Sequence, residues 1–323
     1  MEKKAFFLFV VASSSAFLAA AGPAVSREFL TVDFEPQQVL RYKFVSSRQI
    51  DVEWAAGKSD AEQGQVDTST ETMEMVVAYE PVDVDPYGLT TVKATCEQVT
   101  VKRSKTRARA VKKDAIEFLS GRSFTIKVAA NGKIADYSDL NRLIEWAGEK
   151  AFRPGRGRGR IKEPDMIGDF VATQWFLWDS VSSIKDPAEG VAVGQSWRSK
   201  ILIPAPMVMR KARDITYKLE SIEHAEDGRV AVIGVTSSLS ETVPAGWPVP
   251  YTGRFQMSGT FGFLRGYRVL GLDGNGTESF NIDAGRMQRY EHDYTMRVQA
   301  FLPAPLGVQP MITIKQHIAM ELL

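Results

Sequence analysis

Cysteine and histidine are both scarce in this sequence: its 323 residues include one cysteine, Cys96, and three histidines. A single cysteine excludes an intramolecular disulfide, so a packed core must hold the fold, and a chain of this length can bury one. Cys96 lies in the alternating segment 91–100, where we expect a small buried side chain rather than a reactive thiol. The histidines His224, His292 and His317 are too widely spaced for a helical zinc motif, so we expect neither a metal ion nor a cofactor.

An excess of either charge is also absent. Lys and Arg number 40 against 39 Asp and Glu, which gives a formal net charge of +1. A nearly neutral chain has no general attraction for nucleic acid, so we expect no nucleic-acid partner. Hydrophobic residues make up 44% of the chain, which is enough for a packed globular core.

Long hydrophobic runs are absent beyond the N-terminus, where one extends from Ala5 to about Ala21 behind a short basic start. This pattern is typical of a secretory signal peptide, and cleavage after Ala21 or after Ser26 fits the preference for small residues. The alternative is an uncleaved membrane anchor, but a spanning helix needs ~20 apolar residues and this run ends in Ala and Ser. No cysteine lies near the cleavage sites, so we do not expect a lipid-anchored protein. We expect a signal peptide at 1–26, export to the periplasm or beyond, and no transmembrane segment afterwards.

Alternation of apolar and polar residues with a period of two dominates the rest of the chain, which predicts β-strands. The expected strands are 39–45, 50–54, 70–79, 89–102, 123–129, 200–203, 215–222, 230–237, 254–264, 277–282, 286–298 and 311–320. Turn residues at 85–88, 131–132, 227–228, 273–276 and 283–285 join several of them. Short Asn-Gly and Asp-Gly links of this kind favour tight antiparallel hairpins.

Two helices are expected in the middle of the chain, at 138–147 and 164–183, from N-cap residues and apolar positions at helical spacing. The fold class is therefore α+β, a large bent antiparallel sheet with a two-helix insertion. Residues 27–190 would form an N-terminal β half that ends in the two helices. Residues 191–323 would form a C-terminal antiparallel β half, either as a second domain or continuous with the first.

The segment 273–278, Asp-Gly-Asn-Gly-Thr-Glu, is superficially similar to a calcium-binding loop. Its sixth position is Glu278, where such a loop needs glycine, and Phe280 and Ile282 continue as a strand. The sequence therefore favours a hairpin turn at 273–276.

Charged residues are unevenly distributed. Ten acidic residues and one basic residue lie between Asp51 and Asp85, and seven basic residues without an acidic one lie at 102–113. If the strands 70–79 and 89–102 pair, Glu71 and Glu74 come close to the basic end, and such pairs stabilise a sheet by ~0.2–1 kcal/mol each. Complementary pairing on a solvated face is the favoured interpretation, and a binding face for an anionic polymer is the alternative.

A second basic run joins the two expected helices and contains Arg153, Arg156, Arg158 and Arg160, with glycines between them. Glycine at alternate positions prevents a regular helix, and guanidinium groups suit phosphate, sulfate or carboxylate partners. A solvated linker is the favoured interpretation. If one segment recognises an anionic envelope component, we expect it to be this one.

Motifs for enzymatic nucleophiles are not found. Both candidates, Gly194-Gln-Ser196 and Gly121-Arg-Ser123, lack the second glycine of a nucleophile elbow. Pairs of carboxylates are common, but nothing in the sequence places a pair across a cleft, as a glycosidase would need. Enzymatic activity is therefore uncertain, and the sequence favours a protein without it.

Three segments carry a family resemblance: 123–134 with the helix that follows at Leu140, 193–197, and 274–287. In order, they form a strand with an Asn-Gly turn, a Gly-x-x-Trp start and a strand-turn-strand unit. This order resembles the secreted bacterial proteins catalogued as domain of unknown function 6263. The resemblance would cover most of the mature chain and implies no catalytic residues. The layout is also similar to periplasmic lipoprotein-carrier half-barrels.

These observations favour a non-enzymatic cell-envelope protein that acts as a binding or structural module. One alternative is a periplasmic carrier of a lipid or other apolar ligand, and another is a carboxylate-dependent hydrolase. A carrier would use aromatic side chains of the two expected helices to line its cavity. These are Trp146, Phe170, Trp175, Phe176 and Trp178.

Overall fold

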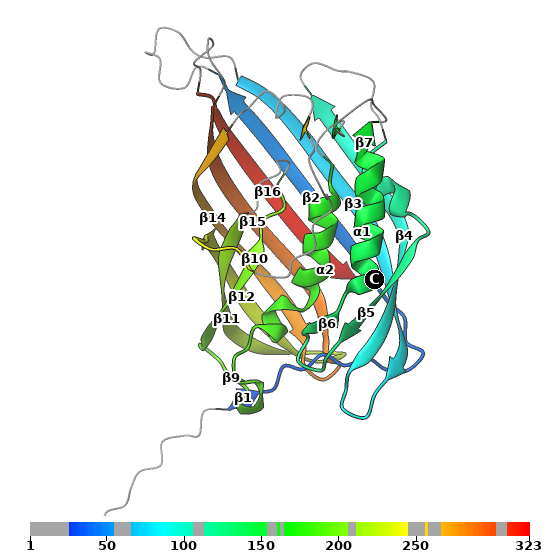
Figure 1. The fold of residues 1–323 in the computed structure, drawn as a ribbon. Coiled ribbons are helices and arrows are strands. Elements are labelled where there is room, and N and C mark those ends of the chain that lie inside the picture. Colours follow the sequence, from blue (N-terminus) through cyan, green and yellow to red (C-terminus); the bar gives the residue numbers. More distant parts are fainter. Residues whose placement is uncertain are drawn as a thin grey trace, which may run out of the picture.

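The fold is that of a computed structural model, which describes part of the chain. The described residues are 26–54, 66–105, 113–153, 160–161, 165–205, 211–244, 256–257, 266–301 and 309–323. Almost all of the expected signal peptide lies outside them. The main feature is a large, bent antiparallel sheet of eleven strands with two helices inserted in mid-chain, as the sequence predicts (Figure 1).

The eleven strands follow one another in a single open sheet. From one edge to the other they are β10 (Ser196–Leu202), β11 (Ala212–Ala225), β12 (Gly228–Leu239), β14 (Gly266–Asn281), β15 (Arg286–Phe301), β16 (Met311–Leu322), β2 (Leu40–Glu53), β3 (Val66–Val84), β4 (Thr90–Lys105), β5 (Ser123–Val128) and β6 (Ile134–Asp136). Because β16 pairs with β2, strands from both 27–190 and 191–323 belong to one sheet.

Short strands complete the described part. β1 (Arg27–Glu28) pairs with β9 (Val191–Ala192). A small sheet combines β7 (Phe152–Arg153), β8 (Arg160–Ile161) and β13 (Gln256–Met257).

The helices follow β6 and precede β10. They are α1 (Ser138–Ala151) and α2 (Ile167–Ser182), with the 3₁₀ turns η1 (Ala115–Leu119) and η2 (Pro187–Glu189) on either side. Figure 1 shows both helices on the concave side of the sheet. Helix α1 buries Leu140, Ile144 and Ala147 at helical spacing, whereas α2 is buried over most of its length. None of the helices in the described residues is both long enough and apolar enough to cross a membrane.

The inward face of the sheet forms most of the core. Along β2 the even-numbered residues from Leu40 to Val52 are buried, and the odd-numbered residues between them are partly or fully exposed. This is the alternation from which the strands are predicted. Cys96 is fully buried in β4 as expected, and burial raises the pKa of its thiol to about 12.

The hairpin turn predicted at 273–276 is wrong, because these residues lie inside β14. A Cβ at Gly276 would come within 2.7 Å of the His292 Cα, and one at Gly274 within 2.8 Å of the Ser237 Oγ. Glycine is required here because neighbouring strands approach closely, and not because the chain reverses direction.

Other turns are where the sequence places them. The residues at 85–88, 131–132, 227–228 and 283–285 connect strands. Gly285 has a φ of 60°, the left-handed region that favours glycine. The strands predicted at 39–45 and 50–54 form one continuous strand, β2.

Candidate functional site

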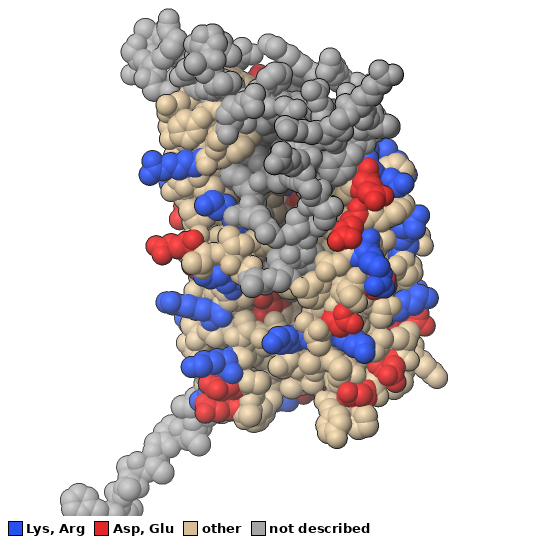
Figure 2. Space-filling view, in the orientation of Figure 1, with Lys and Arg blue, Asp and Glu red and all other residues tan. Residues whose placement is uncertain are grey.

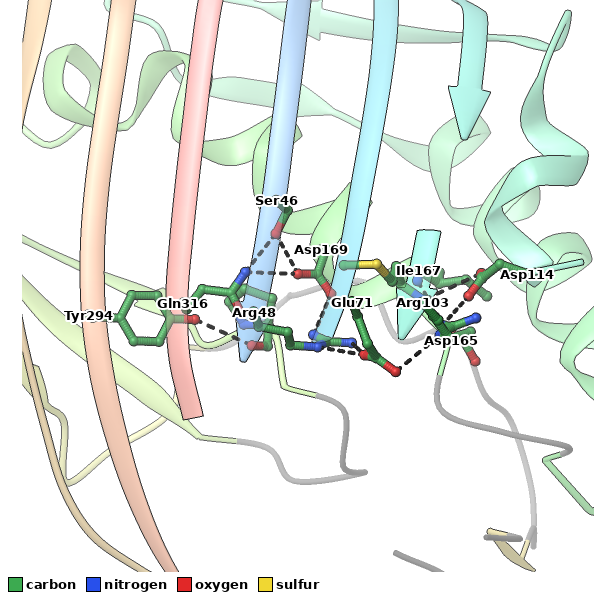
Figure 3. Close-up of polar contacts among 12 residues, drawn as sticks. Ser46, Arg48, Glu71, Arg103, Asp114, Asp165, Ile167, Asp169, Tyr294 and Gln316 are labelled. Atoms are coloured by element: carbon green, nitrogen blue, oxygen red, sulfur yellow. Dashed lines mark hydrogen bonds and ion pairs between the residues drawn. The ribbon is translucent and has the colours of Figure 1, made fainter. Parts of the chain in front are cut away.

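A row of polar side chains crosses the inward face in strict register. Arg103 of β4 is opposite Glu71 of β3, Glu71 opposite Arg48 of β2, Arg48 opposite Gln316 of β16, and Gln316 opposite Tyr294 of β15. We call these five residues the polar row. All five face the interior (Figure 3). Buried apolar residues such as Met73, Ile50, Ile314 and Met296 lie next to the row on the inward face.

Helix α2 is bound to the polar row through Asp169. Its Oδ2 accepts a hydrogen bond from Arg48 Nη1 at 2.9 Å, and its Oδ1 accepts one from Ser46 Oγ at 2.6 Å. Gln316 Nε2 donates to Ser46 Oγ at 2.7 Å (Figure 3). The Arg48 and Asp169 side chains are 0% and 1% exposed, so this is a buried ion pair between helix and sheet.

Glu71 lies between two guanidinium groups. It accepts from Arg48 Nε at 2.8 Å and from Arg103 Nε at 3.0 Å, and Arg103 also pairs with Asp114. Burial alone would raise the pKa of Glu71, but the two arginines outweigh it and lower that pKa. At Asp114 burial prevails over Arg103 and raises the pKa. Opposite charges thus compensate one another along the row.

The second half of α2 contacts β10, β11 and β14 through polar groups. Asp179 accepts from Tyr217 Oη at 2.7 Å and from Ser199 Oγ at 2.8 Å, and Ser180 donates to Glu278. Burial raises the pKa of Asp179. Burial also raises the pKa of Glu278, to about 8, so this carboxyl is protonated at neutral pH.

Arg213 of β11 is the largest fully buried side chain of the described residues. Its guanidinium lies between two rings, with its Cζ 4.7 Å from the centroid of Phe176 of α2 and 4.9 Å from that of Tyr294. Its Nη1 is 2.9 Å from His292 Nδ1. Tyr290 lies beside it: burial raises the pKa of Tyr290 to about 12, and the Arg213 charge counteracts that rise. We call these five residues the arginine cluster.

The contact between Arg213 and His292 sets the state of the imidazole. Arginine can only donate, so His292 Nδ1 accepts and the neutral ring carries its proton on Nε2. Burial and the Arg213 charge lower the pKa of His292 to about 2, which keeps the ring neutral. The ring therefore presents an N–H donor on the side away from Arg213.

Several donors of the arginine cluster are unpaired. Within the described part of the chain, Arg213 Nε, Arg213 Nη2 and His292 Nε2 have no hydrogen-bond partner, and Arg213 forms no ion pair. Glu278 Oε2 and Ser237 Oγ, on neighbouring strands, are unpaired too. An unsatisfied buried polar atom costs ~1–3 kcal/mol, and more where it is charged. Such atoms are uncommon in native interiors and mark a place where polar groups have another purpose.

The aromatic residues expected to line a carrier cavity lie on two sides of the helices. Phe170, Phe176 and Trp178 face the sheet, where they contact Phe124, Tyr290 and Tyr79 respectively. The other two are only partly buried and lie elsewhere. Trp175 packs on Tyr137, and Trp146 lies under the Arg122 guanidinium.

The arginine-rich segment is only partly described. Arg156 and Arg158 lie outside the described residues, and for Arg153 in β7 and Arg160 in β8 only the backbone is described. These two residues are opposite each other in a β-pair, so the backbone brings the ends of the segment together. Its role in binding an anion stays a prediction.

The two glutamates expected near the basic strand end lie on opposite faces of the sheet. Glu74 pairs with Lys102 at 3.3 Å on the outer, solvated face, as the sequence predicts. Glu71 pairs with Arg103 on the inner, buried face. Figure 2 shows basic and acidic side chains interspersed over the described surface in that view, without a large area of one sign.

Two surface hollows are formed by described residues. A groove of ≈ 520 Å³ on the outer face includes His317, Asp293 and Lys315, and one of ≈ 620 Å³ includes Arg27, Trp197 and Arg198. Neither includes Arg213 or Glu278. Among the described residues, no three His, Cys, Asp or Glu side chains come together in a way that could hold a metal ion.

Sequence reasoning missed Arg48, Asp169, Arg213, His292 and Glu278. A usable signal existed for the strand residues, because Arg213 shares the parity of the apolar residues Ile215, Tyr217 and Leu219. A charged residue at an inward position of a strand indicates a buried charge that needs a partner. The partner itself could not be read from that pattern.

Comparison with known proteins gives little to add. No model of a protein family matches the chain. No curated protein matches its sequence. Among solved structures, one described as "lipid-protein interactions in lipovitellin" has a TM-score of 0.45 and 10% sequence identity over 90% of this chain. The chain spans 25% of that structure's length, and a likeness this weak carries no argument about function. The resemblance to domain of unknown function 6263 stays a prediction.

Proposed function

We propose that this chain is an exported, non-enzymatic binding protein that holds an amphiphilic ligand on the concave face of its sheet. One observation carries the proposal: the interior is amphipathic and leaves polar atoms unpaired. Apolar residues such as Phe44, Ile314 and Met296 lie on both sides of the polar row. Ligand sites are mostly apolar, with a few placed polar groups that fix orientation.

The way in which α2 covers this face also supports the proposal. Its buried surface includes the polar residues Asp169, Thr173, Gln174, Asp179 and Ser180. Hydrogen bonds between neutral groups such as Gln174 and Tyr79 contribute only ~0.5–1.5 kcal/mol each, because folding exchanges them for hydrogen bonds to water. A purely structural cover would gain more from apolar packing. The described concave face is occupied by α2, so a ligand would lie between this helix and the sheet.

Export is part of the proposal and rests on the N-terminal sequence alone. The basic start, the apolar run to about Ala21 and the small residues after it support secretion. Expression of the full chain with a C-terminal tag tests this. A mature protein that begins after Ala21 or Ser26 in the exported fraction is expected, and an uncleaved intracellular chain would contradict it.

Binding is tested by mass spectrometry of the purified, folded protein. We expect a mass excess that disappears on denaturation, together with an amphiphile in the organic extract. Once freed of this ligand, the folded protein should bind oleyl alcohol, and calorimetry measures that binding. Repeated preparations of uniform, ligand-free mass that bind neither oleyl alcohol nor oleate would exclude the proposed function.

A hydrolase is the second candidate, because Asp179 and Glu278 approach each other and burial raises the pKa of both. Neighbouring carboxyls whose surroundings shift their pKa values are the groups that acid–base hydrolysis uses. Both are buried, however, with Glu278 only 1% exposed, so water cannot reach them as they stand. Turnover of chromogenic esters or glycosides that is lost in Glu278→Gln would favour this candidate over a binding protein.

A further inference from the structure

Arg213 is a buried cation, and no acidic side chain of the described residues forms an ion pair with it. The Arg213 charge acts on Asp179 of α2 and counteracts the rise of its pKa, but Asp179 accepts its hydrogen bonds from Tyr217 and Ser199. Glu278 of β14 accepts from Ser180. An arginine side chain stays charged in proteins. Removing such a charge from water costs several kcal/mol unless an anion compensates it.

Aromatic rings and one histidine surround the guanidinium, and the Tyr290 hydroxyl lies beside it as a further hydrogen-bonding group. The rings of Phe176 and Tyr294 pack against the guanidinium, and His292 Nδ1 accepts from Nη1. The atoms without partners, Nε and Nη2, form the side-on edge that binds two oxygens of one carboxylate or phosphate. His292 Nε2 adds a further N–H donor to the same cluster.

We infer that the arginine cluster binds the oxyanion head group, a carboxylate or a phosphate, of an amphiphilic ligand whose apolar tail lies against the concave face. The donors fit an acceptor-only group, and the charge of Arg213 fits an anion. Because Arg213 is fully buried, the side chains that cover it must move before a head group reaches it. This inference rests on the proposed function, since it names the head group of the same ligand.

Three ligands with one tail and different heads test the inference: oleate, oleyl phosphate and oleyl alcohol. Calorimetry with the full mature chain should show that one or both anions bind tenfold or more tightly than the alcohol. In Arg213→Met that preference should fall by about tenfold to a hundredfold, which is the range for a hydrogen bond to a charged group. Binding of oleyl alcohol should remain within about threefold.

Two further variants keep the test independent of folding. Arg213→Lys keeps the charge without the planar edge, so it should retain more affinity for oleyl phosphate than for oleate. Lys218→Met removes an exposed cation from the outer face of the same strand and should leave all affinities unchanged. Circular dichroism and thermal unfolding establish whether each variant is folded. If Arg213→Met does not fold, the affinities of Arg213→Lys alone test the oxyanion site.

The outcomes separate the inference from the proposed function. Equal binding of all three ligands, unchanged in Arg213→Met, would overturn the oxyanion site and leave the binding protein in place. Binding of none of them would overturn both. Inorganic phosphate alone, bound as tightly as oleyl phosphate and lost in Arg213→Met, would keep an oxyanion site and contradict the apolar ligand.

Discussion

Arg48 of β2 donates through Nη1 to Asp169 of α2 at 2.9 Å, although 121 residues separate them in the chain. Both side chains are buried, so the pair connects the helix layer to the sheet by charge as well as by packing. The Arg48 charge is shared with Glu71, which in turn neutralises Arg103. Each of these linked buried charges therefore depends on its neighbours, and removal of one should destabilise the fold strongly.

Neutralisation of Glu71 should destabilise the fold strongly. In Glu71→Gln two buried guanidinium groups lose their shared carboxylate, and we expect the free energy of unfolding to fall by about 3–5 kcal/mol. The matched control is Glu74→Gln, three residues along the same strand on the outer face, which should cost less than about 1 kcal/mol. Urea denaturation measures both. Equal losses would contradict the distinction between the buried and the solvated pair.

The pH dependence of stability should contain a contribution from Glu278. Its pKa is raised from 4.5 to about 8 in the folded protein, so the unfolded chain releases this proton first. The resulting stability is complete below pH 4.5 and is lost as pH rises through about 8. Between pH 6.5 and 8 we expect a decline of up to ~1.4 kcal/mol per pH unit. Glu278→Gln should remove that decline, whereas parallel profiles would show that the carboxyl ionises freely.

His292 should also contribute to the pH dependence of stability, at lower pH and in the opposite direction. Its pKa is lowered from 6.5 to about 2, so below pH 6.5 the unfolded chain takes up a proton that the folded protein does not. Its contribution is present above pH 6.5 and is lost as the pH falls toward 2. The gap in stability between wild type and His292→Gln should therefore shift by about 2 kcal/mol from pH 6.5 to 5. A constant gap would mean that the ring protonates in the fold; His224→Gln, at an exposed position, controls for the substitution.

Close packing of β14 on β15 should make Gly276 sensitive to a single methyl group. A Cβ there would lie 2.7 Å from the His292 Cα, and backbone cannot move aside cheaply, so Gly276→Ala should cost at least about 2 kcal/mol. Gly271 on the same strand has its nearest neighbour at 3.9 Å, the Arg297 Nη2. Gly271→Ala should be neutral or stabilising by up to about 1 kcal/mol. Thermal unfolding compares the two, and similar melting temperatures would count against the close approach.

Most strands of the sheet could be predicted from the local sequence pattern, and the predictions that failed have identifiable causes. Period-two alternation predicts most strands, and turn chemistry predicts the reversals at 85–88 and 283–285. The error at 273–276 arises because glycine serves both tight turns and close strand approach, and the neighbours that distinguish these uses are remote in sequence. Their positions in the alternating pattern also predict that Arg48 and Arg213 face inward. The pattern does not predict which residues they contact.

The sequence by itself determined the alternating strands, the central pair of helices, the disulfide-free core around Cys96 and the signal for export that we propose. Those properties follow from interactions within a few residues, which a linear pattern records. Only the tertiary structure decided that Asp169 meets Arg48, and that Arg213 lies between Phe176 and Tyr294 with one edge unpaired. Strand register and the position of α2 set those contacts, and both depend on packing between segments far apart in the chain.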